Sequence, residues 1–251
     1  MSKRAIYIGF DPKEIAAYLV AVNSIYKYLS QEIPIYALEL STLTSYGWYS
    51  RATEVHDGRL YDVISEHPMS TEFAVSRFLV PQLARTGWAL FADCDVLARD
   101  DLAKLFALAD PRYAVMCVKH NHVPAATEKM DGQVQSRYFR KNWSSVCLWN
   151  CDHPSNKKLT VHYVNSVPGR DLHAFSWLTD DEIGELPVEY NFLVGVTPLK
   201  GTNFQPKLVH FTEATPHVRG YENCEYADEW RRELSRIIPN TLRVYGTLPA
   251  K

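Results

Sequence analysis

The chain has 251 residues, with 27 basic and 29 acidic side chains, a formal net charge of −2 and 46% hydrophobic residues. This length and composition are typical of a globular protein with one or two domains. The near-neutral charge argues against a nucleic-acid-binding protein, because no excess of Lys and Arg is available for phosphates. No apolar run approaches the roughly 20 residues of a membrane span. The five cysteines lack C-x-x-C spacing and the chain opens without a secretory signal, so we expect reduced thiols and a cytoplasmic location.

The chain begins with a pattern typical of strand, helix and strand. Ala5 to Phe10 is a short apolar run that suits a buried parallel strand. Pro12 then opens a helix, and its apolar spacing predicts a buried face that includes Ile15 and Leu19. Ile33 to Leu38 is the second strand. This βαβ opening places ligands at the carboxyl ends of the strands.

The remaining elements continue the same α/β pattern. Residues 40–70 lack a firm period and are expected to be rich in loops, whereas Ser70 can cap a helix that runs to about Ala84. A closing helix is expected from Tyr226 to Ile237. The further expected strands are Trp88 to Ala92, Tyr113 to Val118, Ser145 to Trp149 and Lys207 to Phe211. No linker or repeat divides the chain, which predicts a single domain.

The triplet Asp93-Cys94-Asp95 directly follows the apolar strand at Trp88 to Ala92. Because side chains alternate along a strand, the two carboxylates point the same way and the thiol points oppositely. Two hard oxygen ligands on one face suit Mg²⁺ or Mn²⁺. The alternative is ordinary turn chemistry, in which Asp95 caps the following segment.

His210 stands between Val209 and Phe211 at the end of an apolar run. A lone histidine in such a place is often a packed core residue. The functional alternative is a neutral imidazole that completes the two-carboxylate site, which would favour Mn²⁺ over Ca²⁺. Two weaker candidates, the histidines of 120–122 and the basic run 137–142, have a solvated loop as their default interpretation.

Several catalytic signatures are absent from the sequence. It has no G-x-G-x-x-G after the first strand, no P-loop, no G-x-S-x-G and no H-E-x-x-H. These absences argue against a dinucleotide oxidoreductase, a P-loop NTPase, a serine hydrolase and a zincin.

Five segments, taken in order, resemble metal-dependent nucleotide-sugar glycosyltransferases of the GT-A fold, and among them glycosyltransferase family 8. They are IYIGFDPKEIAAYLVAVNSI, STEFAVSRFLVPQLA, LFADCDVLARDDLAKLF, NWSSVCLWNC and PKLVHFTEATPH. The resemblance implies an α/β protein: a single GT-A, Rossmann-like domain over residues 1–251 with a mostly parallel central sheet flanked by helices. Residues 1–118 would bind the nucleotide, and residues 119–251 would supply the acceptor side and the metal-binding histidine.

The resemblance also implies roles for individual residues. Asp93, Asp95 and His210 would hold Mn²⁺, or alternatively Mg²⁺, against the donor diphosphate, with Asp93 also nearest the ribose or donor sugar. The residues that fall at donor-binding positions of the family are Gly9, Phe10, Asp11, Tyr18 and Arg77 for the nucleotide and phosphates, and Ser144 and Ser145 for the transferred sugar.

The sequence departs from the family pattern at two places. Thr215-Pro216-His217 replaces the Lys-Pro-Trp ending, so Arg219 or Lys200 would have to substitute for the diphosphate lysine. The Asp-Gln pair beside the anomeric carbon is also incomplete. Its nearest counterpart is Asp171-Leu172-His173, which makes Asp171 and His173, together with Asp93, the expected catalytic residues. Asp180 and Asp181 are alternatives near the acceptor, and helix capping is their ordinary role.

The expected function is therefore a metal-dependent transfer of a hexose from a UDP-sugar to a glycan or lipid-linked glycan acceptor. Retention of the anomeric configuration follows from the family resemblance alone. The expected partners include no nucleic acid and no membrane span, although peripheral contact with a membrane fits the family. Two alternatives stay open at this point: a nucleotide-sugar or metal-binding protein without turnover, and a sugar nucleotidyltransferase.

Overall fold

The computed structural model describes residues 3–120, 140, 142–198, 201 and 203–245. The candidates His122 and Lys200, and most of the basic run 137–142, lie outside the described residues. The central sheet has the strand order β10-β8-β9-β6-β1-β2. Its strands are β1 (Arg4–Phe10), β2 (Ile35–Glu39), β6 (Trp88–Ala92), β8 (Val115–Cys117), β9 (Val146–Asn150) and β10 (Ile183–Glu185). Only β9 runs against the other strands of this sheet, which confirms the predicted α/β class with a mostly parallel sheet.

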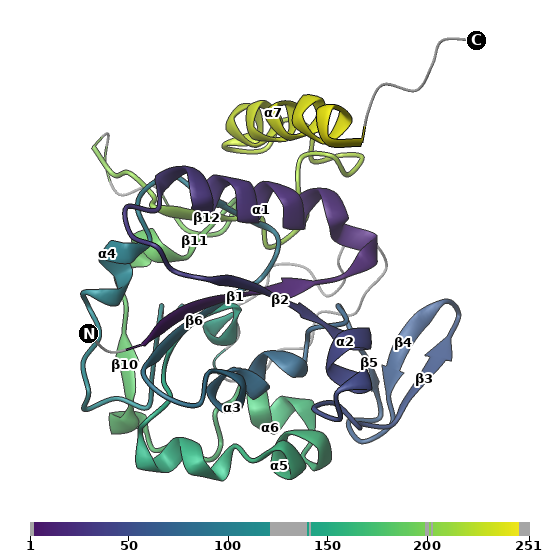
Figure 1. Ribbon diagram of the computed structural model, residues 1–251, viewed down its shortest axis with the longest axis vertical. Coiled ribbons are helices and arrows are strands. Elements are labelled where there is room, and N and C mark those ends of the chain that lie inside the picture. The colour runs from purple at the N-terminus through teal and green to yellow at the C-terminus, as the bar shows by residue number, and fades with distance from the viewer. Residues whose placement is uncertain (1–2, 121–139, 141, 199–200, 202, 246–251) are drawn as a thin grey trace.

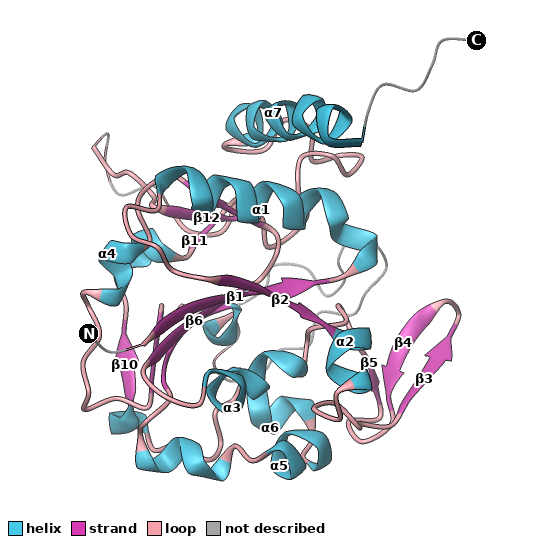
Figure 2. Ribbon diagram, viewed as in Figure 1, coloured by secondary structure: helices cyan, strands magenta, loops and turns pink. Residues whose placement is uncertain are grey.

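Helices cover both faces of the central sheet (Figures 1 and 2). The α1 helix (Ile15–Tyr28) lies on one face, and α7 (Ala227–Tyr245) packs on the outer side of α1. The opposite face carries α3 (Val80–Ala84), α5 (Val161–Ser166) and α6 (Gly169–His173). The short α4 (Ala103–Phe106) completes the helices on the α1 side.

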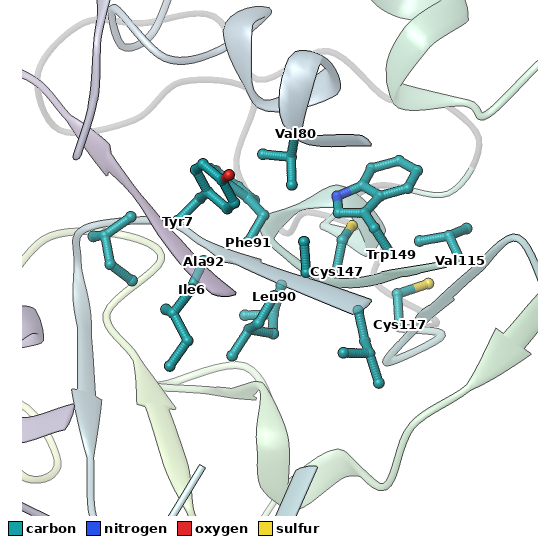
Figure 3. Packing of buried hydrophobic residues seen from close by; sticks show 14 of the residues in the cluster. Ile6, Tyr7, Val80, Leu90, Phe91, Ala92, Val115, Cys117, Cys147 and Trp149 are labelled. Carbon is teal, nitrogen blue, oxygen red and sulfur yellow. The ribbon is translucent and has the colours of Figure 1, made fainter. Parts of the chain in front are cut away.

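The core forms because strand side chains alternate between the two faces. Tyr7, Phe91 and Trp149 point toward Val80 of α3, and Leu90 points to the opposite side (Figure 3). The Trp149 ring stacks at 6.2 Å on Trp177, and further ring contacts extend this aromatic cluster to Phe78 and Phe175. The expected buried strands at the centre of the sheet are thus confirmed.

A second, smaller sheet places β12 (Leu208–His210) between β11 (Phe192–Leu193) and β7 (Val96–Ala98). β12 is parallel to β11 and antiparallel to β7. Both sheets combine strands from residues 1–118 with strands from residues 119–251. β7 begins directly after Asp95, so this small sheet meets the central sheet at the Asp93–Asp95 triplet.

Two predicted segments differ from the structure. The stretch expected to be rich in loops contains α2 (Leu40–Ser45) and a three-stranded antiparallel sheet of β3 (Thr53–His56), β4 (Arg59–Asp62) and β5 (His67–Pro68). Every residue of β3 is exposed, so no apolar alternation marks it in the sequence. The helix expected from Ser70 is shorter: a 3₁₀ turn, η2 (Ser76–Leu79), leads into α3, where Pro81 occupies the first turn because its missing N–H is tolerated there.

The predicted buried face of α1 is also wrong in part. Ile15 and Leu19 are 54% and 39% exposed. The buried side of α1 consists of Ala17, Val20, Ala21, Ser24 and Ile25. Small residues on that side allow the helix to approach the strands beneath it closely.

The remaining 3₁₀ turns connect these elements. They are η1 (Pro12–Glu14), η3 (Trp143–Ser145), η4 (Pro154–Lys158), η5 (Asp180–Glu182) and η6 (Val188–Tyr190). All five cysteines are free thiols in the structure. Among the helices of the described residues, none combines the length and the apolar character needed to cross a membrane.

Candidate functional site

The first carboxylate of the candidate site is fixed where β6 ends. Asp93 directly follows β6, and its backbone N–H donates to the Ser145 carbonyl oxygen at 2.9 Å. Because β9 is antiparallel to β6, the residues that precede β9 lie beside the carboxyl end of β6. Ser144 and Ser145, predicted to lie near the transferred sugar, are therefore brought against Asp93.

The second carboxylate and the imidazole meet through the small sheet. His210 is paired with Val96 across the antiparallel β12–β7 ladder, and the Phe211 N–H donates to the Asp95 carbonyl oxygen at 2.9 Å. This register places His210 Nε2 3.2 Å from Asp95 Oδ1. The histidine is buried, and the Asp95 side chain is 23% exposed.

The three predicted metal residues form one cluster. One ligand atom from each of Asp93, Asp95 and His210 lies within 4.8 Å of the other two. Two carboxylates and an imidazole are a donor set that suits Mn²⁺, and the partial exposure of both carboxylates leaves room for further oxygen ligands. The residues present therefore fit a divalent cation.

Arg77 joins this cluster from the 3₁₀ turn η2. Its Nη1 lies 2.8 Å from Asp93 Oδ1 and donates to the Ser144 carbonyl oxygen at 3.0 Å. The guanidinium carbon also lies 4.9 Å from the centre of the Phe91 ring. The buried guanidinium of Arg77 is thus held directly beside the first carboxylate.

His173, a predicted catalytic residue, is linked to the cluster through Ser144 and Arg77. Its Nδ1 lies 2.7 Å from Ser144 Oγ, and its ring packs edge-on against Phe78. Burial, and then the positive charge of Arg77, lower the pKa of His173 to about 3. The imidazole is therefore neutral at physiological pH and can take part in hydrogen bonds there without carrying charge.

Asn191 contacts the His210 imidazole at the ring nitrogen that does not face Asp95. This fully buried residue, which directly precedes β11, places its Oδ1 2.9 Å from His210 Nδ1. Its Nδ2 donates to Ser145 Oγ at 2.9 Å. Asn191 was not among the site residues predicted from the sequence.

Glu14 is a second residue that the sequence analysis missed. The Cys94 thiol lies 2.8 Å from Glu14 Oε2, so the residue between the two aspartates is tied to the start of α1. Burial, and then the negative charge of Asp95, raise the pKa of Glu14 to about 7. This carboxyl belongs to the same electrostatic environment as the cluster, and no sequence motif marked it.

The predicted nucleotide residues Gly9, Phe10, Asp11 and Tyr18 lie at the end of β1 and on the loop and helix that follow it. A Cβ on Gly9 would lie 2.4 Å from the Phe73 ring, so glycine is required there by close packing. The Asp11 carboxylate accepts hydrogen bonds from the backbone N–H groups of Lys13 and Glu72, which ties this loop to the segment before η2. The rings of Phe10 and Tyr18 meet edge to face at 5.0 Å.

Three other predicted residues are not part of the metal cluster in the described structure. Asp171, at the start of α6, lies 3.3 Å from Arg170 Nε. Arg219 is exposed in the segment that leads to α7. Asp180 forms an ion pair with Arg140 and belongs to an exposed 3₁₀ turn. Their predicted roles rest on the resemblance alone.

Comparison with known proteins gives one relative by sequence. The chain is 44% identical over 232 residues to Protein CDI of Arabidopsis thaliana, and the match covers 91% of this chain and 85% of that protein. No family model matches the chain.

Comparison of structures gives several glycosyltransferases with the same fold. WbbM, a bifunctional glycosyltransferase, matches with a TM-score of 0.60 at 16% identity over 93% of this chain, which spans only 50% of the WbbM chain. The galactosyltransferase LgtC, solved with donor and acceptor sugar analogues, matches with a TM-score of 0.58 at 15% identity over 92% of this chain and 95% of its own. GlyE of Streptococcus pneumoniae TIGR4 gives 0.56 at 14% identity, over 99% of this chain and 66% of its own. These matches confirm the predicted GT-A fold.

Proposed function

Since the chain belongs to the family of the Arabidopsis thaliana Protein CDI and has the GT-A fold, we propose that it is a metal-dependent glycosyltransferase. It would move a hexose from a UDP-sugar to a glycan or lipid-linked glycan acceptor. One observation carries the proposal: Asp93, Asp95 and His210 converge within 4.8 Å, where the end of β6, the start of β7 and the end of β12 meet. In open α/β sheets, ligands bind at the carboxyl ends of the strands.

The proposed donor site uses this cluster to hold Mn²⁺ or Mg²⁺. A divalent cation held there would supply Lewis-acid stabilisation of the charge that develops on the β-phosphate oxygen as the sugar leaves. Arg77 holds Asp93 in place and adds a fixed positive charge beside it, which is electrostatic help that needs no rearrangement. No covalent intermediate on the protein is required by this arrangement.

The remaining predicted roles belong to the same proposal. Gly9 and Phe10 at the end of β1, Asp11 of the following loop and Tyr18 of α1 would border the uridine. Ser144 and Ser145 would border the transferred sugar. Asp171 and His173 would lie toward the acceptor, where a neutral His173 donates or accepts hydrogen bonds without carrying charge. Arg219 would approach the diphosphate. Retention of configuration, the cytoplasmic location and peripheral membrane contact stay predictions.

The first experiment measures binding and turnover separately. Isothermal titration calorimetry with UDP, GDP and CDP, each with Mn²⁺ and with EDTA, measures which nucleotide binds and whether its binding depends on metal. Release of UDP from UDP-glucose and UDP-galactose, in the absence of any acceptor, then reads turnover. We expect UDP to be preferred, and its affinity to fall at least about tenfold without metal, a loss of about 1.4 kcal/mol in binding free energy.

Matched variants make the result specific. Asp95→Asn and His210→Ala should remove the metal-dependent part of UDP binding, whereas Asp110→Asn, at a partly exposed aspartate paired with Arg112, should leave it unchanged. Metal-dependent UDP binding without release of UDP would favour the non-catalytic alternative. Binding of UDP that is unaffected by EDTA and by both site variants would contradict the proposal.

A further inference from the structure

A chain of hydrogen bonds leads from a backbone carbonyl to the imidazole of the metal cluster. The Ser145 hydroxyl donates to the Asn142 carbonyl oxygen at 2.7 Å, and Asn191 Nδ2 donates to Ser145 Oγ at 2.9 Å. Asn191 Oδ1 then faces His210 Nδ1 at 2.9 Å. Asn191 is completely buried, and Ser145 and His210 are 4% and 2% exposed, so bulk water does not compete for these bonds.

The direction of every bond in this chain is determined by its first member. A backbone carbonyl can only accept, so the Ser145 hydroxyl proton is committed to Asn142, and Ser145 Oγ must accept from Asn191. The amide nitrogen of Asn191 therefore faces Ser145 and its oxygen faces His210. An amide oxygen can only accept, so His210 Nδ1 must carry a proton.

This direction determines what the imidazole presents to the cluster. With the proton on Nδ1, the remaining nitrogen, Nε2, is the one 3.2 Å from Asp95 Oδ1, and its lone pair is available to a cation shared with Asp93 and Asp95. Nδ1 carries its proton whether or not Nε2 holds one as well. Hydrogen-bond direction therefore fixes the proton on Nδ1 at either charge of His210.

We infer that Asn191 is a positioning residue: through Ser145 and the Asn142 carbonyl, it fixes His210 as the Nδ1–H tautomer and aims Nε2 at the divalent cation. The inference rests on the metal site of the proposed function. Ser145 has a double part in it, because its carbonyl oxygen accepts from the Asp93 N–H while its hydroxyl orients Asn191. One residue thus ties the imidazole ligand to the first carboxylate.

Two substitutions at position 191 separate orientation from packing. Asn191→Leu keeps a similar volume and removes the acceptor, so the Mn²⁺ affinity of the protein without nucleotide should fall about 10- to 100-fold, as expected for loss of a hydrogen bond that orients a metal ligand. Asn191→Asp keeps an acceptor against Nδ1, and the Ser145 hydroxyl can turn from the Asn142 carbonyl to donate to the second carboxylate oxygen. The Mn²⁺ affinity of Asn191→Asp should therefore not fall by more than a factor of about 3 below the wild type. Titration calorimetry or the EPR signal of free Mn²⁺ measures both.

Asn156→Leu is the matched control. Asn156 is also buried, and its Nδ2 donates to the carbonyl oxygens of Ala114 and Asn150, away from the cluster. We expect this variant to lose stability and to keep its Mn²⁺ affinity. Equal Mn²⁺ affinity in wild type and a folded Asn191→Leu variant would overturn the inference.

The tautomer can also be read directly, in the metal-free protein. ¹⁵N NMR of histidine-labelled wild type, assigned with His210→Ala, should show a protonated Nδ1 at His210. An Nε2–H tautomer with bare Nδ1 would overturn the inference even if Asn191→Leu fails to fold. If the wild type shows protonated Nδ1 and binds no Mn²⁺, the metal site of the proposed function fails while the tautomer assignment stands, so the two failures are distinguishable.

Discussion

Asp93, the first carboxylate of the cluster, is paired with a buried arginine from another element: Arg77 Nη1 lies 2.8 Å from Asp93 Oδ1, and the two side chains are 7% and 16% exposed. The same nitrogen donates to the Ser144 carbonyl, so Arg77 links the end of β6 to the start of β9. The pair satisfies Asp93 in the absence of a cation, and a bound cation would share that carboxylate.

We therefore predict that Arg77→Met depends on metal for its stability. Removing one partner of a buried ion pair typically costs about 3 to 5 kcal/mol, because the other charge is left uncompensated. Mn²⁺ would supply part of the missing positive charge, so the rise in Tm on adding Mn²⁺ should be larger in Arg77→Met than in the wild type. Arg99→Met, which breaks a more exposed pair with Glu229, is the control. An equal Mn²⁺ effect in Arg77→Met and wild type would argue against a cation at Asp93.

Gly9→Ala should destabilise the protein through one contact. The added Cβ would lie 2.4 Å from Phe73 Cδ2, and overpacking of this kind typically costs about 1 to 3 kcal/mol. Urea unfolding of Gly9→Ala, Phe73→Leu and the double variant tests this in one cycle. Because Phe73→Leu makes room for the methyl group, the double variant should be more stable than the sum of the single effects predicts. Strict additivity would show that the strain lies elsewhere.

The sheet of β3, β4 and β5 is attached to the core by a buried ion pair. Arg51 contacts both Asp62 carboxylate oxygens at 2.6 Å, and its Nη1 donates to the carbonyl oxygens of Val164 and Val167 at the end of α5. The side chains are 0% and 3% exposed.

We expect Arg51→Met to lower the free energy of unfolding by about 3 to 5 kcal/mol, because it leaves Asp62 charged and unpaired in the interior. The double variant Arg51→Met/Asp62→Leu should recover part of that loss. Breaking the Arg112–Asp110 pair at the surface by Arg112→Met should leave the free energy of unfolding nearly unchanged. Similar losses at the two pairs, measured by urea unfolding, would show that burial does not determine the cost.

The raised pKa of Glu14 predicts how the stability of the metal-free protein changes with pH. Its pKa is raised from 4.5 to about 7, so between these values the folded protein holds a proton that the unfolded chain releases. The free energy of unfolding therefore falls as the pH rises from 4.5 to about 7.

Glu14→Gln removes this dependence, because the amide carries no charge at any pH. In EDTA, Glu14→Gln should be more stable than the wild type at pH 8, and the difference should shrink toward pH 5. Urea unfolding at several pH values measures it, with Glu32→Gln, an exposed glutamate for which the wild-type slope should persist, as the control. A difference that is constant with pH would show that Glu14 ionises normally.

Local patterns predict the sheet and mark Asp93, Asp95 and His210 as candidate residues, whereas their joint role as metal ligands was implied by the family resemblance. Apolar runs mark the buried strands, and carboxylates or histidine directly after such runs must lie at a strand end. Two strand pairings that complete the cluster are recorded by no local pattern. The pairing of β12 with β7 brings His210 to Asp95, and the antiparallel pairing of β9 with β6 fixes the position of Asp93. Asn191 and Glu14 were missed because their roles depend on contacts across the fold.

The wrong predictions have equally specific causes. α1 is apolar on more than one side, so the period of 3.6 residues fits both the stripe with Ile15 and Leu19 and the stripe with Ala17 and Ala21. Only the packing of β1 and β7 against the helix selects the second stripe. The exposed β3 carries no apolar alternation, so nothing in its sequence separates it from a loop.

The strand β12 pairs with β7, which precedes it in the chain by more than a hundred residues. The site is therefore assembled in a fixed order. During synthesis, Asp93 and Asp95 leave the ribosome together with the strands β1, β2 and β6, long before Asn191 and His210 exist. A nascent chain that has formed this half of the central sheet holds two neighbouring carboxylates and no imidazole. Among the described strands, β12 is the last to be made, and it supplies the imidazole of the proposed metal site. A product of premature termination before β12 would therefore lack the third proposed ligand.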